Sequence, residues 1–218
     1  MRLILVLFRT AFYLLYHQFA WTYDLVAATV SLGRWRDWVH SAMPFLSGRV
    51  LEIGYGPGHL QATLLAKGFS AFGLDESRQM AHQTRRRLRK RGFDPNLARG
   101  YAQSLPFPAG VFDTAVATFP SEYIFDPLTL RELRRVLIAT GKLVVIPTAW
   151  ITGGHPVEKL AAWLFRVTGE APGKPRTISG SVRDRFARAG FLVHSELISM
   201  RGSQVLVILA SKTKYSAS

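Results

Sequence analysis

Short apolar runs alternate with longer helical stretches from Arg49 towards the end of the chain. Compact apolar runs are typical of buried parallel strands, whereas the longer stretches carry helical start and stop signals. The runs are 49–54, 70–75, 96–102, 112–119 and 141–146, and the helical stretches are 56–68, 77–92 and 126–141. This alternation predicts an α/β fold in which helices cover both faces of a parallel sheet.

The last two apolar runs break this pattern. After a helical stretch over 181–190, the runs 191–200 and 204–212 are separated by only three residues, 201–203. So short a link cannot make a crossover between parallel strands, so the two runs are predicted to form an antiparallel hairpin. The predicted fold is a doubly wound, seven-stranded, mostly parallel sheet that ends in an antiparallel hairpin.

The first 33 residues are the most apolar part of the chain. Arg9 interrupts the opening run, and 10–23 then carries no Asp, Glu, Lys or Arg. Neither apolar stretch reaches the roughly 18–20 residues that span a bilayer. Arg9 also lies where a secretory signal would have its uninterrupted apolar centre, which argues against a cleaved signal.

Helical spacing gives this segment one apolar stripe, and two interpretations remain open. In one, the helix packs on the domain as a lid. In the other, it lies in a membrane surface, with nearby arginines against anionic headgroups. Trp21, Trp35 and Trp38 follow the stripe, and tryptophan favours the boundary between hydrocarbon and water. The thin polar face of the helix favours membrane contact.

Composition narrows the class of protein. Lys and Arg number 28 against 14 Asp and Glu, so the formal net charge is +14, while 48% of the residues are hydrophobic. Disordered chains combine high charge with low hydrophobicity and are therefore excluded. The absence of Cys excludes a disulfide scaffold and Cys-ligated zinc. Excess positive charge indicates an anionic partner, either nucleic acid or a membrane surface.

The sequence VLEIGYGPG contains the strongest chemical signal in the chain. It places Gly54, Gly56 and Gly58 between a predicted strand and a helix, where glycines permit a tight turn and close approach to a ligand. Glu52 just before this loop would repel a phosphate and attract an ammonium group. Asp75 ends the next strand, where an acid can accept both hydroxyls of a ribose. A ligand with a ribose, an ammonium and no phosphate fits S-adenosylmethionine.

Residues 49–211 resemble the class I S-adenosylmethionine-dependent methyltransferases. Within them, the stretch AQSLPFPAGVFDTAVATF (102–119) resembles the A-x-x-LPF…FD stretch of the ubiquinone/menaquinone biosynthesis C-methyltransferases and related lipid methyltransferases. The segment 23–38 is similar to the N-terminal segment of that group. The resemblance implies an N-terminal helical region over 1–48, a methyltransferase domain over 49–211 and a tail over 212–218.

The resemblance also implies cofactor-binding roles for ten positions. These are Tyr23, Glu52, Gly54, Gly56, Gly58, Asp75, Met80, Ala102, Thr118 and Phe119. Asp75 would hold the ribose, and Met80 and Ala102 would lie against the adenine. Thr118 and Phe119 would lie near the methionine end of the cofactor.

Tyr23 would close over the cofactor, and Glu52 would support the glycine loop or the methionine amine. Two departures from the family pattern matter. Tyr101 stands where the family usually has an acid for the adenine amino group, which leaves that contact to the backbone and Gln103. The sequence TFPSEY (118–123) also differs from the Asn/Asp-Pro-Pro-aromatic motif, which counts against methylation of base amino groups in DNA or RNA.

Three residues are candidates for assisting methyl transfer, because removing a proton from the acceptor helps the reaction. His155 follows the fifth predicted strand, while Glu122 and Tyr123 follow the fourth, so all three belong to the mouth of the site. Each has a structural alternative. His155 lies beside a helix start, and Glu122, Tyr123 and Asp126 precede the next helix and can cap it. The other five histidines show no metal-ligand spacing, so no metal is predicted.

The run 85–92 contains six basic residues. A charge run on a helix is usually a solvated face, and nucleic acid or anionic lipid is the alternative partner. No aromatic residue is interleaved with these charges, which argues against a platform for stacking single-stranded bases.

The sequence therefore predicts a cytoplasmic methyltransferase, peripheral to the inner face of the membrane, that uses S-adenosylmethionine and an amphipathic, lipid-like or quinone-like acceptor. One alternative is a methyltransferase of a soluble small molecule, with the N-terminal segment as a lid. Another is a nucleic-acid-binding methyltransferase, or a cofactor-binding protein without turnover.

Overall fold

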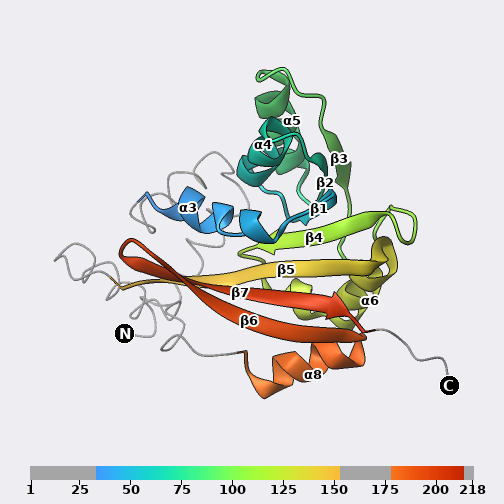
Figure 1. Cartoon of the computed structure of the whole chain (residues 1–218). Helices are drawn as coiled ribbons and strands as arrows, with labels where there is room; N and C mark the ends of the chain where they lie inside the picture. Colours follow the sequence, from blue (N-terminus) through green and yellow to red (C-terminus); the bar gives the residue numbers. More distant parts are fainter. Residues whose placement is uncertain (1–32, 153–177, 214–218) are drawn as a thin grey trace, which may run out of the picture.

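The computed structural model describes residues 33–152 and 178–213, which form one seven-stranded sheet (Figure 1). The strand order is β3-β2-β1-β4-β5-β7-β6. The strands are β1 (Arg49–Ile53), β2 (Ser70–Asp75), β3 (Asn96–Arg99), β4 (Phe112–Thr118), β5 (Leu137–Ile151), β6 (Phe191–Met200) and β7 (Ser203–Lys212). The first five strands pair in parallel, and β7 runs antiparallel to both β5 and β6. The predicted fold class is confirmed, including the terminal hairpin.

Helices cover both faces of this sheet. They are α3 (Trp35–His40), α4 (His59–Ala66), α5 (Arg78–Arg89), α6 (Pro127–Val136) and α8 (Gly180–Arg188), with single turns η1 (Met43–Phe45) and η2 (Glu122–Phe125). Polar caps fix where α5, α6 and α8 begin, because Ser77, Asp126 and Ser179 each accept a backbone N–H of the first turn. Pro127 follows the cap of α6 at the position where a missing N–H costs nothing.

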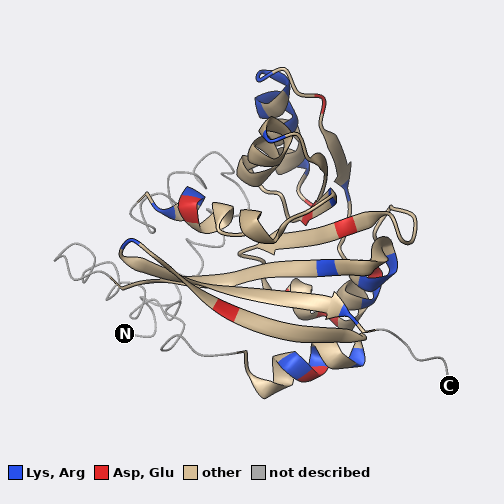
Figure 2. Cartoon of the chain, viewed as in Figure 1, with Lys and Arg blue, Asp and Glu red and all other residues tan. Residues whose placement is uncertain are grey.

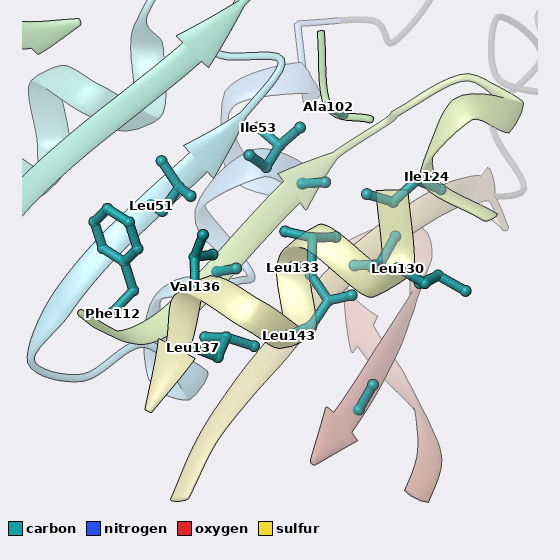
Figure 3. Close-up of a cluster of buried hydrophobic side chains, with 14 of the residues drawn as sticks. Leu51, Ile53, Ala102, Phe112, Ile124, Leu130, Leu133, Val136, Leu137 and Leu143 are labelled. Carbon is teal, nitrogen blue, oxygen red and sulfur yellow. The ribbon is translucent and has the colours of Figure 1, made fainter. Parts of the chain in front are cut away.

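Successive residues along the central strands face opposite sides and build two apolar clusters. In β1, Leu51 packs with α6 and α8, whereas Val50 packs with α3 and α4. Figure 3 shows the first cluster between the sheet and α6, which contains Leu130 and Leu133 of α6 and Leu143 of β5. By this alternation Glu52 shares the α3–α4 side with Val50, which brings a carboxylate under those helices.

The boundary between α6 and β5 differs from the prediction. A helix was expected over 126–141, but α6 ends at Val136 and Leu137 already has an extended backbone (φ −74°, ψ 141°). Leu137 pairs with Phe112 of β4, so tertiary strand pairing overrides the helical pattern of the sequence. At its other end β5 continues past 146 to Ile151 along β7, and the pairing breaks around Pro147, which has no N–H to donate.

The N-terminal part of the described chain packs into the domain. Trp38 is 4% exposed, and its indole Nε1 donates a hydrogen bond to Ser203 Oγ of β7 at 3.0 Å. Trp35 is half-buried beside it. Trp38 therefore belongs to the buried α3–α4 cluster rather than to a membrane boundary, and Trp35 packs partly against the same cluster. The apolar stripe, Trp21 and Tyr23 lie outside the described residues, and within 33–152 and 178–213 no helix is long and apolar enough to cross a bilayer.

Basic residues gather in the last turns of three helices (Figure 2). They are Arg86, Arg87 and Arg89 of α5, Arg134 and Arg135 of α6, and Arg185 and Arg188 of α8. The C-terminal end of a helix carries partial negative charge, so cations stabilise it. In a doubly wound sheet these helix ends lie at the edge where the parallel strands begin, opposite the edge where ligands bind.

Candidate functional site

The loop between β1 and α4 contains three glycines with a left-handed backbone. Gly54, Gly56 and Gly58 have φ angles of 71°, 49° and 77°, a region that side chains disfavour. A Cβ on Gly58 would collide with the Thr84 side chain of α5, so that glycine allows two helices to pack. A Cβ on Gly56 would point into open space. The loop therefore leaves room for a ligand at Gly56.

Asp75, at the end of β2, is bound directly to this loop. Its Oδ2 accepts the N–H of Gly56 at 2.8 Å, and its Oδ1 accepts the N–H of Ser77 at 2.8 Å. Burial raises the pKa of the carboxyl, while these two hydrogen bonds act in the opposite direction. Each carboxylate oxygen can accept a second hydrogen bond, so Asp75 retains capacity for two hydroxyl groups of a ligand.

Glu52 is a buried acid beneath the same loop. It is 2% exposed, and its Oε2 accepts no hydrogen bond from any described residue. Burial raises its pKa to about 8, a hydrogen bond from Gln61 lowers it, and the nearby charge of Asp75 raises it. A buried carboxyl with an unsatisfied oxygen is costly unless a partner arrives. Glu52 is therefore suited to receive a cationic group.

A small cavity connects these residues with α3 and β4. Its wall includes Trp35 and Val39 of α3, Glu52 of β1, Gly54 and Gly56 of the loop, and Thr118 at the end of β4. Ligands of doubly wound folds bind at this edge, where the parallel strands end and the strand order reverses between β1 and β4. The cavity thus lies where the topology predicts a ligand site.

Phe119 has an unusual backbone just after β4. It is the one non-glycine residue with positive φ in the described part of the chain, at 50°. Its N–H donates to Ile146 O at 2.7 Å, and its ring lies 4.3 Å from that of Trp35 at an interplanar angle of 33°. The Trp38 ring lies 6.2 Å away on the same side. The strained backbone places Phe119 behind the wall of the cavity.

The turn η2 brings one of the predicted catalytic residues to the loop. Tyr123 is half-buried, and its hydroxyl lies only 2.6 Å from the place of a Cβ on Gly54. Glu122 on the same turn is exposed. Asp126 takes its structural alternative, because its Oδ1 accepts the Leu128 N–H and caps α6.

The side expected to hold the adenine is open to solvent in part. Met80 is half-buried on α5, Ala102 is 6% exposed, and Tyr101 is 68% exposed. Gln103, predicted to help hold the adenine, directs its Nε2 to Asp126 Oδ2 at 3.3 Å. Its side-chain amide is therefore engaged at the start of α6.

The structure brings most of the predicted residues to one edge of the sheet. Glu52, Gly54, Gly56 and Thr118 line one cavity. Asp75 and Tyr123 contact its loop, whereas Tyr23 and His155 lie outside the described residues. The sequence prediction missed Trp35 as a site residue. Its position inside the family-like segment 23–38, three residues before the buried Trp38, was the available signal.

Comparison with known proteins agrees with this geometry. A family model described as "Methyltransferase domain" matches residues 50–141. A demethylmenaquinone methyltransferase of Anoxybacillus flavithermus is 30% identical over 136 residues, which cover 58% of this chain and 57% of that protein. Residues 50–141 thus match a methyltransferase domain, and the chain is similar to the class I, S-adenosylmethionine-dependent methyltransferases.

Two further relatives extend the comparison. A ubiquinone/menaquinone biosynthesis C-methyltransferase of Pasteurella multocida is 28% identical over 141 residues, covering 60% of this chain and 53% of that protein. The match thus spans little more than half the length of either curated relative. The structure of a SAM-dependent methyltransferase from Aquifex aeolicus aligns over 83% of this chain and 93% of its own, with a TM-score of 0.58 and 17% identity, which shows the shared fold.

The residues of the cavity fit S-adenosylmethionine. The open direction at Gly56 leaves room beside the loop, and Asp75 has acceptor capacity for the ribose hydroxyls. The unsatisfied Oε2 of Glu52 suits the methionine ammonium.

Asp75→Asn should weaken S-adenosylmethionine binding about 10- to 30-fold, because the amide removes the charge that strengthens hydrogen bonds from hydroxyl groups. Isothermal titration calorimetry on the full chain measures this. Asp113→Asn is the matched control, since Asp113 also accepts a backbone N–H, from Arg49 at 2.7 Å, at the edge where β1 and β4 begin. Equal affinity in the wild type and both variants would show that Asp75 does not bind the cofactor.

Proposed function

We propose that this methyltransferase transfers a methyl group from S-adenosylmethionine to an amphipathic, quinone-like acceptor at a membrane surface. The observation that supports it most is the glycine loop, whose Gly56 is bound to Asp75 while the buried Glu52 lies in the wall of the same cavity. The quinone-like acceptor is inferred from the relatives named for demethylmenaquinone and for ubiquinone/menaquinone biosynthesis.

S-adenosylmethionine supplies a methyl group on a positively charged sulfur; transfer breaks that S–C bond, forms one bond to the acceptor, and yields S-adenosylhomocysteine and a proton. The protein's part is largely positioning, because the reaction is an in-line displacement that needs the two reacting atoms held together. In our proposal Asp75 fixes the ribose and Glu52 the ammonium. Burial under α3 and α4 keeps Glu52 away from water.

Tyr123 is our candidate for contact with the acceptor. Its hydroxyl lies against Gly54 at the end of β1, and η2 holds it there from the opposite side of the sheet. A phenol in this position can donate a hydrogen bond to an acceptor oxygen. Glu122, exposed on the same turn, and His155 are the candidates for taking up the proton.

Membrane contact is assigned to the apolar residues before Gly33, which would bring the protein to the surface where a prenylated acceptor resides. The competing acceptor is a soluble small molecule. In that case the residues before Gly33 would act as a lid, and the packing of α3 beside the cavity supports this alternative. Nucleic acid is the weaker alternative, because the basic residues in the last turns of α6 and α8 lie at the edge of the sheet opposite the cavity.

The acceptor class is tested by incubating the full chain with methyl-tritiated S-adenosylmethionine and three pools: reduced total membrane lipid, soluble metabolites and total RNA. Reduction converts quinones to quinols, whose rings are nucleophilic. We expect label in the lipid pool and none in that pool with the Gly56→Val variant. Label confined to soluble metabolites or RNA would replace the proposed acceptor. Cofactor binding without label in any pool would contradict turnover.

A further inference from the structure

The wall of the cavity formed by α3 carries an aromatic ring supported by a second ring. We propose that Trp35, held by Phe119, is a specificity-determining residue that recognises the positive charge on the sulfur of the methyl donor. The inference rests on the proposed function, because it concerns the same cofactor. It assigns the indole a task that the glycine loop, Asp75 and Glu52 do not perform.

The position of Trp35 supports this assignment. It lines the cavity together with Glu52, Gly54 and Thr118, so its indole lies between the glycine loop and the end of β4. The family resemblance places Thr118, at the end of β4, near the methionine end of the cofactor. The ring of Phe119 packs against the indole at 4.3 Å.

Both flanks of Trp35 are fixed to the hairpin of β6 and β7. Arg34 Nη1 donates to Gly202 O at 3.2 Å, and Trp38 Nε1 donates to Ser203 Oγ at 3.0 Å. The indole is therefore held in place before a ligand arrives, which reduces the entropy lost on binding.

The backbone at Phe119 provides a second, independent observation. A positive φ at an aromatic residue carries a conformational cost and persists only where the surroundings enforce it. The hydrogen bond from Phe119 N–H to Ile146 O enforces it, and the result is a ring stacked behind Trp35. Such strain gathers at ligand sites. Phe119, the strained residue, packs against Trp35, which is the aromatic residue of α3 that lines the cavity.

The chemistry of the wall favours a cation. The face of an indole attracts positive charge, and tryptophan does so more strongly than the other aromatic residues. Glu52 adds a carboxyl to the same cavity. His59 of α4 also lines the cavity, and Arg87 of α5 contacts its lining, with Nη1 3.2 Å from His59 Nε2 and 2.7 Å from Pro57 O. The acid Glu52 and the indole of Trp35 thus come from β1 and α3, whereas the basic groups come from α4 and α5.

A wall of this kind distinguishes the donor from its product. The sulfur carries its charge before transfer and is a neutral thioether afterwards. Cation–π attraction should therefore favour S-adenosylmethionine over S-adenosylhomocysteine, which lessens inhibition by the product. A residue that only packs would affect both ligands alike.

The test compares affinities for S-adenosylmethionine, S-adenosylhomocysteine and sinefungin, which has an ammonium-bearing carbon in place of the sulfonium. Calorimetric titrations use the full chain and its Trp35→Leu and Trp35→Phe variants. We expect Trp35→Leu to lower the ratio of affinities for donor over product by about 3- to 20-fold, and the ratio for sinefungin over product likewise. The affinity ratios of Trp35→Phe should lie between those of the wild type and those of Trp35→Leu.

Phe45→Leu is the matched control, because Phe45 belongs to the same apolar cluster but does not line the cavity. It should leave both ratios unchanged, and thermal unfolding confirms that each variant is folded. Equal weakening of all three ligands in Trp35→Leu, or unchanged ratios, would overturn the inference. A wild-type chain that binds none of the three would instead overturn the proposed function.

Discussion

Replacing Gly56 by valine is expected to lower the affinity for S-adenosylmethionine by more than about 100-fold. Gly56 is the residue of the loop whose missing side chain faces open space, and that space adjoins the cavity with Glu52. A branched side chain there occupies the volume that the cofactor requires. The same change disturbs the N–H that Gly56 donates to Asp75. Calorimetric titration of the full chain measures the loss.

A second glycine separates lost binding from lost stability. Gly68, after α4, has a φ of 79° and also has nothing within 4 Å of an added Cβ. Gly56→Val and Gly68→Val therefore carry a similar conformational penalty of about 1–3 kcal/mol, which thermal unfolding detects in both. Only the variant at Gly56 should lose the cofactor. If both variants bind the cofactor equally weakly, or equally strongly, the glycine loop is not part of the cofactor site.

The order of elements could be predicted because the apolar period changes visibly along this chain. The strands are continuous apolar runs, and the three-residue link 201–203 leaves no alternative to a hairpin. The α6–β5 boundary could not be predicted in this way. The sequence pattern places Leu137 in the helix. Its extended backbone results from pairing with Phe112, which is distant in sequence.

The site could be predicted to the extent that its residues follow directly from strand ends. Asp75 ends β2 and therefore reaches the loop after β1, as sequence alone suggested. Trp35 reaches the same cavity from outside the strand–helix alternation, through packing of α3 on β7. The positive φ of Phe119 depends on a hydrogen bond to β5, and no local pattern announces it.

Glu52 should make the free protein less stable as the pH rises. Its ordinary pKa of 4.5 applies when the chain is unfolded, whereas burial raises it to about 8 in the folded state. Between these values the folded chain binds a proton that the unfolded chain has lost, so folding is favoured at the low end and the advantage fades towards pH 8. The change across this window is about 4 to 5 kcal/mol in the free energy of unfolding.

The matched variant is Glu52→Gln, which resembles the protonated acid at every pH. Urea unfolding from pH 5 to 8 should show the decline in the wild type and a flatter profile in the variant. Other groups titrate in both proteins and cancel in the difference. Burial lowers the pKa of His40 from its ordinary value of 6.5, which acts in the opposite sense, and Asp75 has a raised pKa of its own. Parallel profiles would show that Glu52 is ionised throughout.

The same acid links cofactor binding to proton release. An ammonium beside Glu52 favours the ionised carboxylate, so binding near pH 7 should expel about one proton. Calorimetry in phosphate and in Tris, whose ionisation enthalpies differ, measures that number directly. Glu52→Gln should release none, and the wild-type affinity should rise from pH 6 to pH 8.

The groups that face Glu52 are Asp75, Tyr55 and Gln61. Burial raises the pKa of Tyr55 to about 12, so it does not titrate in this range. Proton release that persists in Glu52→Gln would assign it to Asp75, and the ammonium would then have to bind elsewhere in the cavity.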